Sequence, residues 1–406
     1  MTIQSIHLEN FRNYRRLDLH VGPSINVFYG NNAQGKTNIM EAIYLCACAR
    51  SHRTSKDRDL IFHNRDMDQD KKEIINYYQV HLNFYEEENS HHESVRIRYE
   101  EEEGKRPKRT VYSDLVPYEK MQDYLGNFNA VIFAPEDLQL IKEGPSIRRR
   151  YVDLLISQVK PTYFFNLQRF SRILIQRNSV IKAVKQAYNG NYLSEEQNMK
   201  ISYWDYPLAE AAAKIITDRI YFTKKISDYA AENHLNISNG NEKLDVTYKT
   251  ITGLLSEVDE NDPYLSEKII EEKILDKYLS THKEDCDRGI TIHGPHRDDL
   301  EILLNNENIR IFASQGQQRS AALSLKLAEL FVLKDITKQA PVLLLDDVFS
   351  ELDVKRRQCL LSSMKGSQVF VTCTDRFYIE NLFDTDVNDG KNISFFRVSE
   401  GFAEPA

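Results

Sequence analysis

The chain has 406 residues, of which 41% are hydrophobic, so it is long enough to bury a substantial core in two or three domains. Its 22 Tyr and 19 Phe argue against a largely disordered chain, and no run approaches the roughly 20 apolar residues of a membrane span. Five scattered cysteines are typical of a reduced cytosol. The net charge of −8, from 53 basic and 61 acidic residues, argues against a general nucleic-acid binder but permits a local basic groove.

Hydrophobic periodicity divides the chain into three stretches. In the first, alternation predicts strands over 3–8, 17–19 and 25–29 and further strands between 64 and 130, including 77–84 and 95–99. Helical spacing predicts a helix over 36–49. In the second, helical patterns cover 148–186, 202–234 and 264–285. In the third, we expect strands at 289–293, 300–304, 342–345 and 369–372 and helices at 316–336 and 353–364. This order predicts an α/β domain, residues 1–146 and 287–406, split by a helical insertion, residues 147–286.

A phosphate-binding motif follows the predicted strand at 25–29. Residues 30–37 read GNNAQGKT and match the Walker A pattern G-x-x-x-x-G-K-[ST]. Because the loop opens a helix, its backbone N–H groups would surround a phosphate. Lys36 would neutralise the β- and γ-phosphates of ATP, and Thr37 would coordinate Mg²⁺. The expected nucleotide contacts are Gly30, Asn31, Asn32, Ala33, Gln34, Gly35, Lys36 and Thr37.

Two carboxylates follow the apolar run in residues 341–353, PVLLLDDVFSELD. Such a run is typical of a strand buried on both faces of a parallel sheet, and ligands bind at the carboxyl ends of such strands. We expect Asp346 to hold Mg²⁺ with Thr37, and Asp347 to act as the general base for water. Lys36, Asp346 and Asp347 are therefore the predicted catalytic residues.

A second anion site is predicted at residues 314–319, SQGQQR, which open a helix. A Ser and a Gly at a helix N-terminus suit a phosphate group. One chain does not need two phosphate sites, whereas two copies facing each other would each cap the nucleotide of the other.

The motifs GNNAQGKT, SQGQQR and LLLDDVFSELD, which follow one another in this order around a helical insertion, resemble the ATP-binding-cassette (ABC) heads of the structural-maintenance-of-chromosomes class. Three further segments narrow the resemblance to the RecF family of bacterial recombination and repair proteins: ENFRNY at 9–14, FAPEDLQLIKEGPSIRRR at 133–150 and HGPHRDDL at 293–300. The resemblance implies an α/β fold, namely an ABC-type P-loop ATPase head with mixed sheets around a P-loop helix and an inserted all-helical arm domain. The resemblance is weakest in residues 155–285, which contain no recognised motif.

The resemblance also implies a function. Family members are ATP-dependent DNA-binding proteins with slow ATP hydrolysis, in which ATP closes two heads into a homodimer. Their expected partners are DNA at single-stranded/double-stranded junctions or gaps, and the RecR and RecO proteins, with which they load recombinase at stalled or damaged forks. The expected location is cytoplasmic and nucleoid-associated, without a membrane partner.

Carried over by position, the resemblance assigns further nucleotide contacts. Ser314, Gln315, Gly316 and Gln317 become the cassette signature, with Ser314 and Gly316 facing phosphate. Asp353 occupies the D-loop that communicates across the dimer. Arg12 and Asn13 lie where such heads contact nucleotide.

Three positions depart from transporter cassettes. Asp347 replaces the usual Glu, which fits slow turnover, and Thr374 replaces the usual switch His. The Q-loop position is unclear, because Pro135 and Glu136 stand at the best-matching place.

Other charged clusters have two readings. The runs Arg148–Arg150 and Lys105–Arg109 (KRPKR) would contact DNA or form solvated faces. The segment HGPHRDD, residues 293–299, would form either a metal site or a tight turn at Gly294-Pro295, and the turn is favoured. Cys46 and Cys48 point away from each other on a helix and are expected to be core residues. The alternative function is an ABC-headed nuclease with a metal site in the insertion, which would need clustered carboxylates.

Overall fold

The computed structural model describes residues 1–54, 56–62, 75–86, 91–114, 116–187, 192–250, 254–255, 258–259, 262–377, 380 and 392–406. The chain forms two compact units, one made of Met1–Leu138 and Glu329–Ala406, the other of Gln139–Ala328. Helix α9 (Gln315–Thr337) contributes residues to both units. Among the described residues, no helix combines the length and the apolar character that a membrane span requires.

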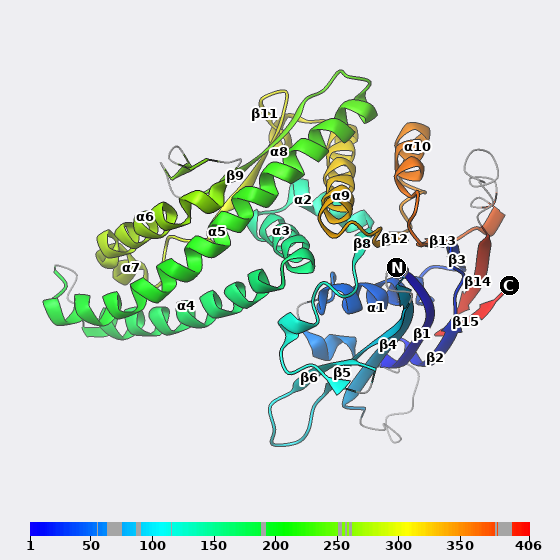
Figure 1. Cartoon of the computed structure of the whole chain (residues 1–406), viewed down its shortest axis with the longest axis horizontal. Coiled ribbons are helices and arrows are strands. Elements are labelled where there is room, and N and C mark those ends of the chain that lie inside the picture. Colours follow the sequence, from blue (N-terminus) through cyan, green and yellow to red (C-terminus); the bar gives the residue numbers. More distant parts are fainter. Residues whose placement is uncertain are drawn as a thin grey trace. The chain divides into compact units, whose positions relative to one another are not determined.

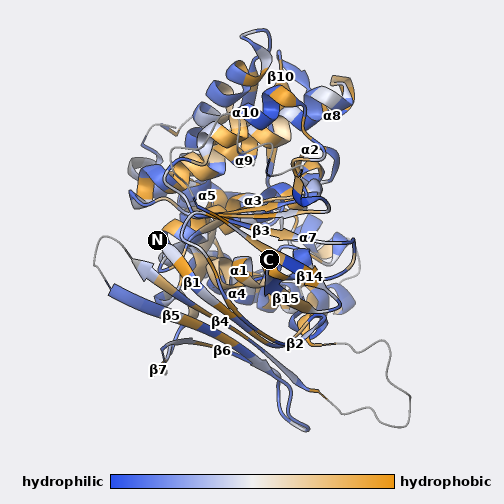
Figure 2. Ribbon diagram, turned by 90° about the vertical axis from the view of Figure 1, so that its right-hand side faces the viewer, coloured by the Kyte–Doolittle hydropathy of each residue, from blue (hydrophilic) through white to orange (hydrophobic). Residues whose placement is uncertain are grey.

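One sheet of the first unit is antiparallel throughout and, among the described residues, has the order β2-β1-β4-β5-β6-β7. Its strands are β1 (Thr2–Phe11), β2 (Tyr14–His20), β4 (Tyr77–Glu86), β5 (His91–Glu100), β6 (Lys108–Ser113) and β7 (Val116–Pro117). Hydrophobic and hydrophilic residues alternate along β1, β4 and β5 (Figure 2). The sheet therefore buries one face, as the period-2 patterns at 3–8, 77–84 and 95–99 predict.

The other sheet of the first unit has the order β15-β14-β3-β13-β12-β8 in the described part of the chain. All its neighbouring strands pair in parallel except β15, which is antiparallel to β14. Its strands are β3 (Ile25–Tyr29), β8 (Ala130–Phe133), β12 (Val342–Asp346), β13 (Val369–Cys373), β14 (Ile393–Ser399) and β15 (Phe402–Pro405). Every residue of β8, β12 and β13 is buried, which confirms that the apolar run at 342–345 lies in the interior of a parallel sheet.

Helix α1 (Lys36–Cys48) contacts strands of both sheets and is the centre of the first unit. Eleven of its 13 residues are buried, because a helix covered on two sides has little surface left for water. Cys46 and Cys48 are buried and form no disulfide in the described part of the chain, which confirms their prediction as core residues. The shorter helices of this unit are η1 (Asp57–Leu60), η3 (Met121–Asp123), η4 (Pro135–Leu138) and α10 (Val354–Ser363).

The second unit is mainly helical (Figure 1). Its helices are α2 (Gln139–Lys142), α3 (Pro145–Val159), α4 (Pro161–Ala187), α5 (Glu195–Ser238), η6 (Pro263–Ser266), α6 (Glu267–Ser280), α7 (His282–Arg288), α8 (Ile309–Phe312) and the first part of α9. The predicted helix over 148–186 is divided at Lys160, since the residue before a proline disfavours the helical conformation. The 44 residues of α5 span about 66 Å.

The second unit also contains a small sheet, so the expectation of an all-helical insertion is corrected. Strand β9 (Leu244–Lys249) pairs with β10 (Asp299–Leu304), which pairs with β11 (Glu307–Asn308). Because β9 lies within 147–286 and its partner lies beyond 287, the compact unit ends at residue 328 instead of at the predicted boundary. The strand predicted at 289–293 is absent, because Gly289 ends α7 with φ +77° and the N–H groups of 291 and 292 bond to side chains.

Candidate functional site

The Walker A loop, residues 30–37, connects β3 to α1 in the first unit. Gly30 and Gly35 have φ of +147° and +118°, in the region that favours glycine. A Cβ at Gly35 would lie 2.5 Å from Nδ2 of Asn13, and one at Gly30 would lie 2.3 Å from the carbonyl oxygen of Val398. Among the described residues, no side chain caps the N-terminus of α1. P-loops bind phosphate at a helix N-terminus of this kind.

The ammonium group of Lys36 lies against this loop. It donates hydrogen bonds to the carbonyl oxygens of Gly30 and Asn31, at 2.6 and 2.8 Å, and the side chain is buried. Burial lowers the pKa of Lys36, and the carboxylates of Asp347 and Asp346 oppose that shift. The structure thus brings Lys36 close to the two predicted carboxylates, which come from the other end of the chain.

Asp346 ends strand β12 and is 4% exposed. Its Oδ1 accepts hydrogen bonds from the hydroxyls of Thr37, at 3.0 Å, and Thr372, at 2.7 Å. Burial raises the pKa of the Asp346 carboxyl, and the two threonine hydroxyls act against this rise. A hydroxyl and a carboxylate oxygen side by side are hard oxygen ligands of the kind that Mg²⁺ prefers. The two predicted metal ligands, Thr37 and Asp346, therefore lie together.

Asp347 has φ of +52°, in the left-handed region that Asp tolerates better than most residues. Its N–H donates to Oγ1 of Thr372 at 2.9 Å, and the Ser350 hydroxyl donates to its carbonyl oxygen at 2.8 Å. These bonds hold the backbone of Asp347 in this conformation directly after β12. The side chain is partly exposed, as a group that acts on water requires.

Asn13 and Arg12 reach the Walker A region in different ways. Asn13 donates to the carbonyl oxygen of Gln34 at 2.8 Å and accepts from Asn38 at 2.7 Å. It therefore links the Walker A loop to the first turn of α1. The guanidinium of Arg12 instead forms a bidentate pair with the fully buried Glu41, at 2.7 and 2.8 Å, and donates to the carbonyl oxygen of Asp59. Nucleotide contact by Arg12 stays a prediction, since its hydrogen bonds in this structure serve the packing of α1.

Three other predicted positions lie in the first unit. Glu136, in η4, is exposed, and its charge raises the pKa of Asp346, which places it near the carboxylate pair. Asp353 is the N-cap of α10, accepting from the N–H of Arg356 at 2.9 Å and pairing with its guanidinium. Thr374 follows β13 and is exposed. Asn31, Asn32 and Ala33 are exposed at the tip of the Walker A loop.

The predicted signature lies in the second unit, at the start of α9. Ser314 and Gln317 form a capping box, in which each side chain accepts from the backbone N–H of the other, at 2.8 and 3.3 Å. Gln317 also donates to Glu242 at 2.9 Å. Ser314, Gln315 and Gly316 are exposed. The segment is thus a helix N-terminus that the capping box stabilises and whose small residues, Ser314 and Gly316, are exposed to solvent.

The structure contradicts the DNA contact expected of Arg148. Its guanidinium is buried, forms a bidentate pair with Asp299 at 2.7 and 2.8 Å, and donates to the carbonyl oxygen of Glu143. Arg149 donates to the carbonyl oxygen of Asp298 at 2.6 Å. In the other basic run, Lys105 pairs with Glu102 and Arg109 pairs with Asp57 at 3.0 Å. DNA contact by the run Lys105–Arg109 stays a prediction.

The segment 293–299 forms the predicted turn. The N–H of Arg297 donates to the carbonyl oxygen of Gly294 at 2.8 Å, with Pro295 at the second position of the turn. In the described part of the chain, no group of three or more His, Cys, Asp or Glu side chains is arranged to hold a metal ion. The metal reading of this segment and the nuclease alternative therefore lack support.

Sequence reasoning missed Thr372 and Glu41. Both are buried polar residues inside elements that look purely structural, a strand and a helix. The only available signal was their polarity within otherwise apolar runs, since buried polar side chains need partners.

Comparison with known proteins identifies the family of the chain. The family model described as "RecF/RecN/SMC N terminal domain" matches residues 2–388. "DNA replication and repair protein RecF" of Acetivibrio thermocellus is 41% identical over 401 residues, covering 99% of each chain. The protein of the same name from Bacillus cereus is 39% identical over 382 residues, covering 94% of each chain.

Solved structures agree as well. One described as "Structure of the recombination mediator protein RecF-ATP in RecFOR pathway" is 33% identical, with a TM-score of 0.83, and the match covers 100% of this chain and 97% of that chain. An Smc head domain from Pyrococcus furiosus, 17% identical with a TM-score of 0.51, covers 100% of this chain and 96% of that chain and shares the fold. The predicted fold class, an ABC-type ATPase head, is confirmed, and the chain belongs to the RecF family.

Proposed function

We propose that the chain is an ATP-dependent DNA-binding protein of recombinational repair and replication-fork maintenance, a weak ATPase in which ATP acts as a switch. ATP binding would join two copies around DNA and help partner proteins to load recombinase at gaps. The observation that carries the proposal is the proximity of Thr37 and Asp346, 3.0 Å apart, beside the buried Lys36. This combination supports binding of ATP with Mg²⁺, and relatives carry the names given above.

Each residue of the site has a task in this proposal. The N–H groups of the Walker A loop and Lys36 bind the phosphates, and Thr37 and Asp346 hold Mg²⁺, which neutralises charge on the phosphates when bound. Asp347 orients water and accepts its proton. The short side chain of Asp347, whose backbone N–H is held by the Thr372 hydroxyl, is consistent with slow turnover.

The exposed signature supports a shared site. Ser314 and Gly316 lie at a capped helix N-terminus of the second unit, so they are available to the nucleotide of another copy. Asp353, exposed at the start of α10, would communicate across the same dimer. We propose that the first unit binds nucleotide and that the second unit contributes the signature.

The partners follow from the relatives. One solved relative is described as part of the RecFOR pathway, so RecR and RecO are the proposed protein partners. DNA at single-stranded/double-stranded junctions or gaps is the proposed nucleic acid. A cytoplasmic, nucleoid-associated location fits these partners.

The experiment that tests the proposal is a mass measurement with ATP, with ADP and without nucleotide. Wild-type chain should dimerise with ATP alone. Ser314→Arg should bind ATP as a monomer and should fail to dimerise, because a bulky cation replaces the small group that caps the partner's phosphate. Normal ATP-dependent dimerisation of Ser314→Arg would overturn the shared site.

A mixture of variants sharpens this test. Ser314→Arg and Lys36→Ala are each defective, but their heterodimer combines both defects in one site and two intact halves in the other. Partial recovery of ATP hydrolysis on mixing supports the shared site. The control is each variant measured alone at the same total protein concentration as the mixture.

A further inference from the structure

The turn at 293–299, which the proposed ATP chemistry does not use, forms one wall of a pocket in the second unit. The pocket has a volume of about 710 Å³, and the end of β9 and helix α6 form its other walls. Its basic and hydroxyl-bearing walls include Lys249, Lys273, Lys277, Ser280, His293 and Arg297. We name this the HGP pocket, after the His-Gly-Pro sequence that begins the turn.

Two cations of the HGP pocket are available to a ligand. The side chains of Lys277 and Arg297 have no hydrogen bond or ion pair with any residue that the structure describes, and Arg297 is exposed. Lys249, by contrast, forms an ion pair with Glu301 at 2.9 Å. Burial and, after it, the charge of Lys277 lower the pKa of His293, which lies on the same wall of the pocket.

Two carboxylates of the same wall have partners that do not line the pocket. Asp299 forms the bidentate pair with Arg148, and Asp298 accepts a hydrogen bond from the hydroxyl of Tyr248. Burial raises the pKa of Asp298 to about 6. Asp276 is the remaining carboxylate of the pocket and is exposed to water. The pocket therefore favours an anion over a cation.

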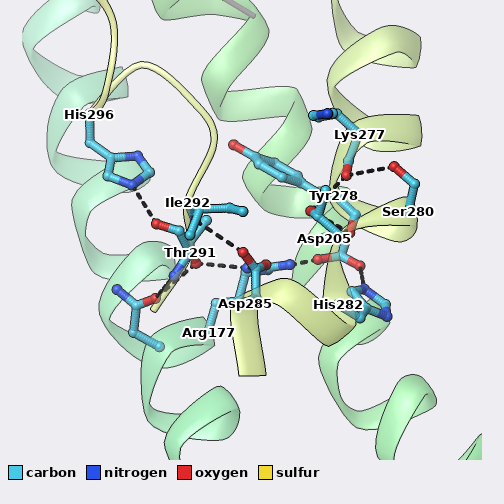
Figure 3. A network of polar contacts seen from close by, with 12 residues as sticks. Arg177, Asp205, Lys277, Tyr278, Ser280, His282, Asp285, Thr291, Ile292 and His296 are labelled. Atoms are coloured by element: carbon cyan, nitrogen blue, oxygen red, sulfur yellow. Dashed lines mark hydrogen bonds and ion pairs between the residues drawn. The ribbon is translucent and has the colours of Figure 1, made fainter. Parts of the chain in front are cut away.

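Next to Gly294 lie two buried polar atoms that have no hydrogen-bond partner among the described residues, the hydroxyl of Tyr278 and Nδ1 of His296. The Tyr278 side chain is 0% exposed, and a Cβ at Gly294 would lie 2.5 Å from its hydroxyl. In Figure 3 this hydroxyl points towards the loop that carries Thr291 and His296, and no dashed line reaches it. A buried hydroxyl of this kind needs a partner, such as a ligand or an ordered water.

We propose that the HGP pocket binds phosphate groups of a DNA strand; this inference rests on the proposed DNA-binding function. Lys273, Lys277 and Ser280 recur at i, i+4 and i+7 on α6 and so share one helix face that spans about 10 Å. That span exceeds one phosphate group and suits a strand with successive phosphates. Arg297 and Lys277 supply the charge, and Ser280 supplies a hydroxyl donor.

The test is the affinity for a labelled gapped DNA duplex across a series of salt concentrations, with ATP present. Arg297→Glu and Lys277→Glu should each lower the affinity about tenfold and reduce the slope of log affinity against log salt by about one. Lys268→Glu is the matched control, because it makes the same charge change at an exposed position of α6 outside the pocket. It should leave both quantities unchanged.

The outcomes separate the inference from the proposed function. If wild-type chain binds DNA with ATP but both pocket variants match Lys268→Glu, the inference is wrong and the function stands. If wild-type chain does not bind DNA at all, both are wrong. Calorimetry tests whether the pocket binds a free phosphate compound instead of DNA. Inorganic phosphate and ATP are titrated into Lys36→Ala, in which the Walker A site is disabled. If Lys36→Ala binds either compound and the added substitution Arg297→Glu abolishes that binding, the pocket is a site for a free phosphate compound and the DNA assignment is wrong.

Discussion

Replacing Thr372 by Val tests how the carboxylate pair is held. The Thr372 hydroxyl donates to Oδ1 of Asp346 at 2.7 Å and accepts from the N–H of Asp347 at 2.9 Å. Val has nearly the same shape as Thr and lacks the hydroxyl, so the substitution removes both hydrogen bonds without opening a cavity.

The expected effect follows from burial. Asp346 is 4% exposed, so water cannot replace the lost donor. A hydrogen bond to a charged group contributes about 1.5–3 kcal/mol, and the neutral one to the N–H of Asp347 contributes about 1 kcal/mol. We expect the free energy of unfolding to fall by about 2–4 kcal/mol. Affinity for ATP with Mg²⁺ should fall roughly tenfold, because Asp346 loses the group that orients it.

Urea unfolding and calorimetry, the latter with Mg²⁺ and with a chelator, measure these two effects. Thr372→Ser is the control, because it keeps the hydroxyl and loses only a methyl group. It should retain the affinity of the wild-type chain for ATP with Mg²⁺. Equal free energies of unfolding and equal affinities for the Val and Ser variants would refute the role given to the hydroxyl.

Three further predictions concern single side chains. Lys36→Ala should weaken ATP binding about 100-fold or more by calorimetry, because the phosphate charge loses its buried cation; unchanged affinity would remove the site assignment. Asp347→Asn should keep ATP binding and slow hydrolysis about 100-fold in a phosphate-release assay, and hydrolysis at the wild-type rate would exclude Asp347 as the base. Burial lowers the pKa of His296 to about 4, so the unfolded chain takes up a proton first as pH falls below 6.5 and stability is lost between pH 6.5 and 4. His296→Gln should reduce that loss by up to about 3 kcal/mol in urea unfolding at a series of pH values, and an identical pH profile for both chains would contradict it.

Local patterns were sufficient to predict most elements of the first unit. The Walker A loop depends on a strand, a glycine-rich turn and a helix that are adjacent in sequence, and β12 is a continuous apolar run. Thr372 could not be predicted in this way. It meets Asp346 only because β12 and β13 pair in parallel with these two residues in register.

The prediction for Arg148 failed for a related reason. Three consecutive residues on a helix point in directions about 100° apart, so three arginines in a row cannot all lie on the same solvent-exposed face. One of them turned inwards, where Asp299 from a distant segment neutralises it. Strand β9 was missed because its alternation of Leu244, Val246 and Tyr248 is short. Its partner is also distant in sequence, since Val246 pairs with Ile302 in β10, 56 positions later.

The pairing of β3 has a consequence for synthesis. Asn26 in β3 pairs with Phe370 in β13, 344 positions later. A ribosome that adds about 5–20 residues per second needs roughly 20–70 s to bridge that distance. During this interval the strand that leads into the Walker A loop has none of its parallel neighbours β13 and β14. A polypeptide released before residue 369 would carry the complete GNNAQGKT motif and still be unable to build the sheet that shapes it, so incomplete products would not compete for nucleotide.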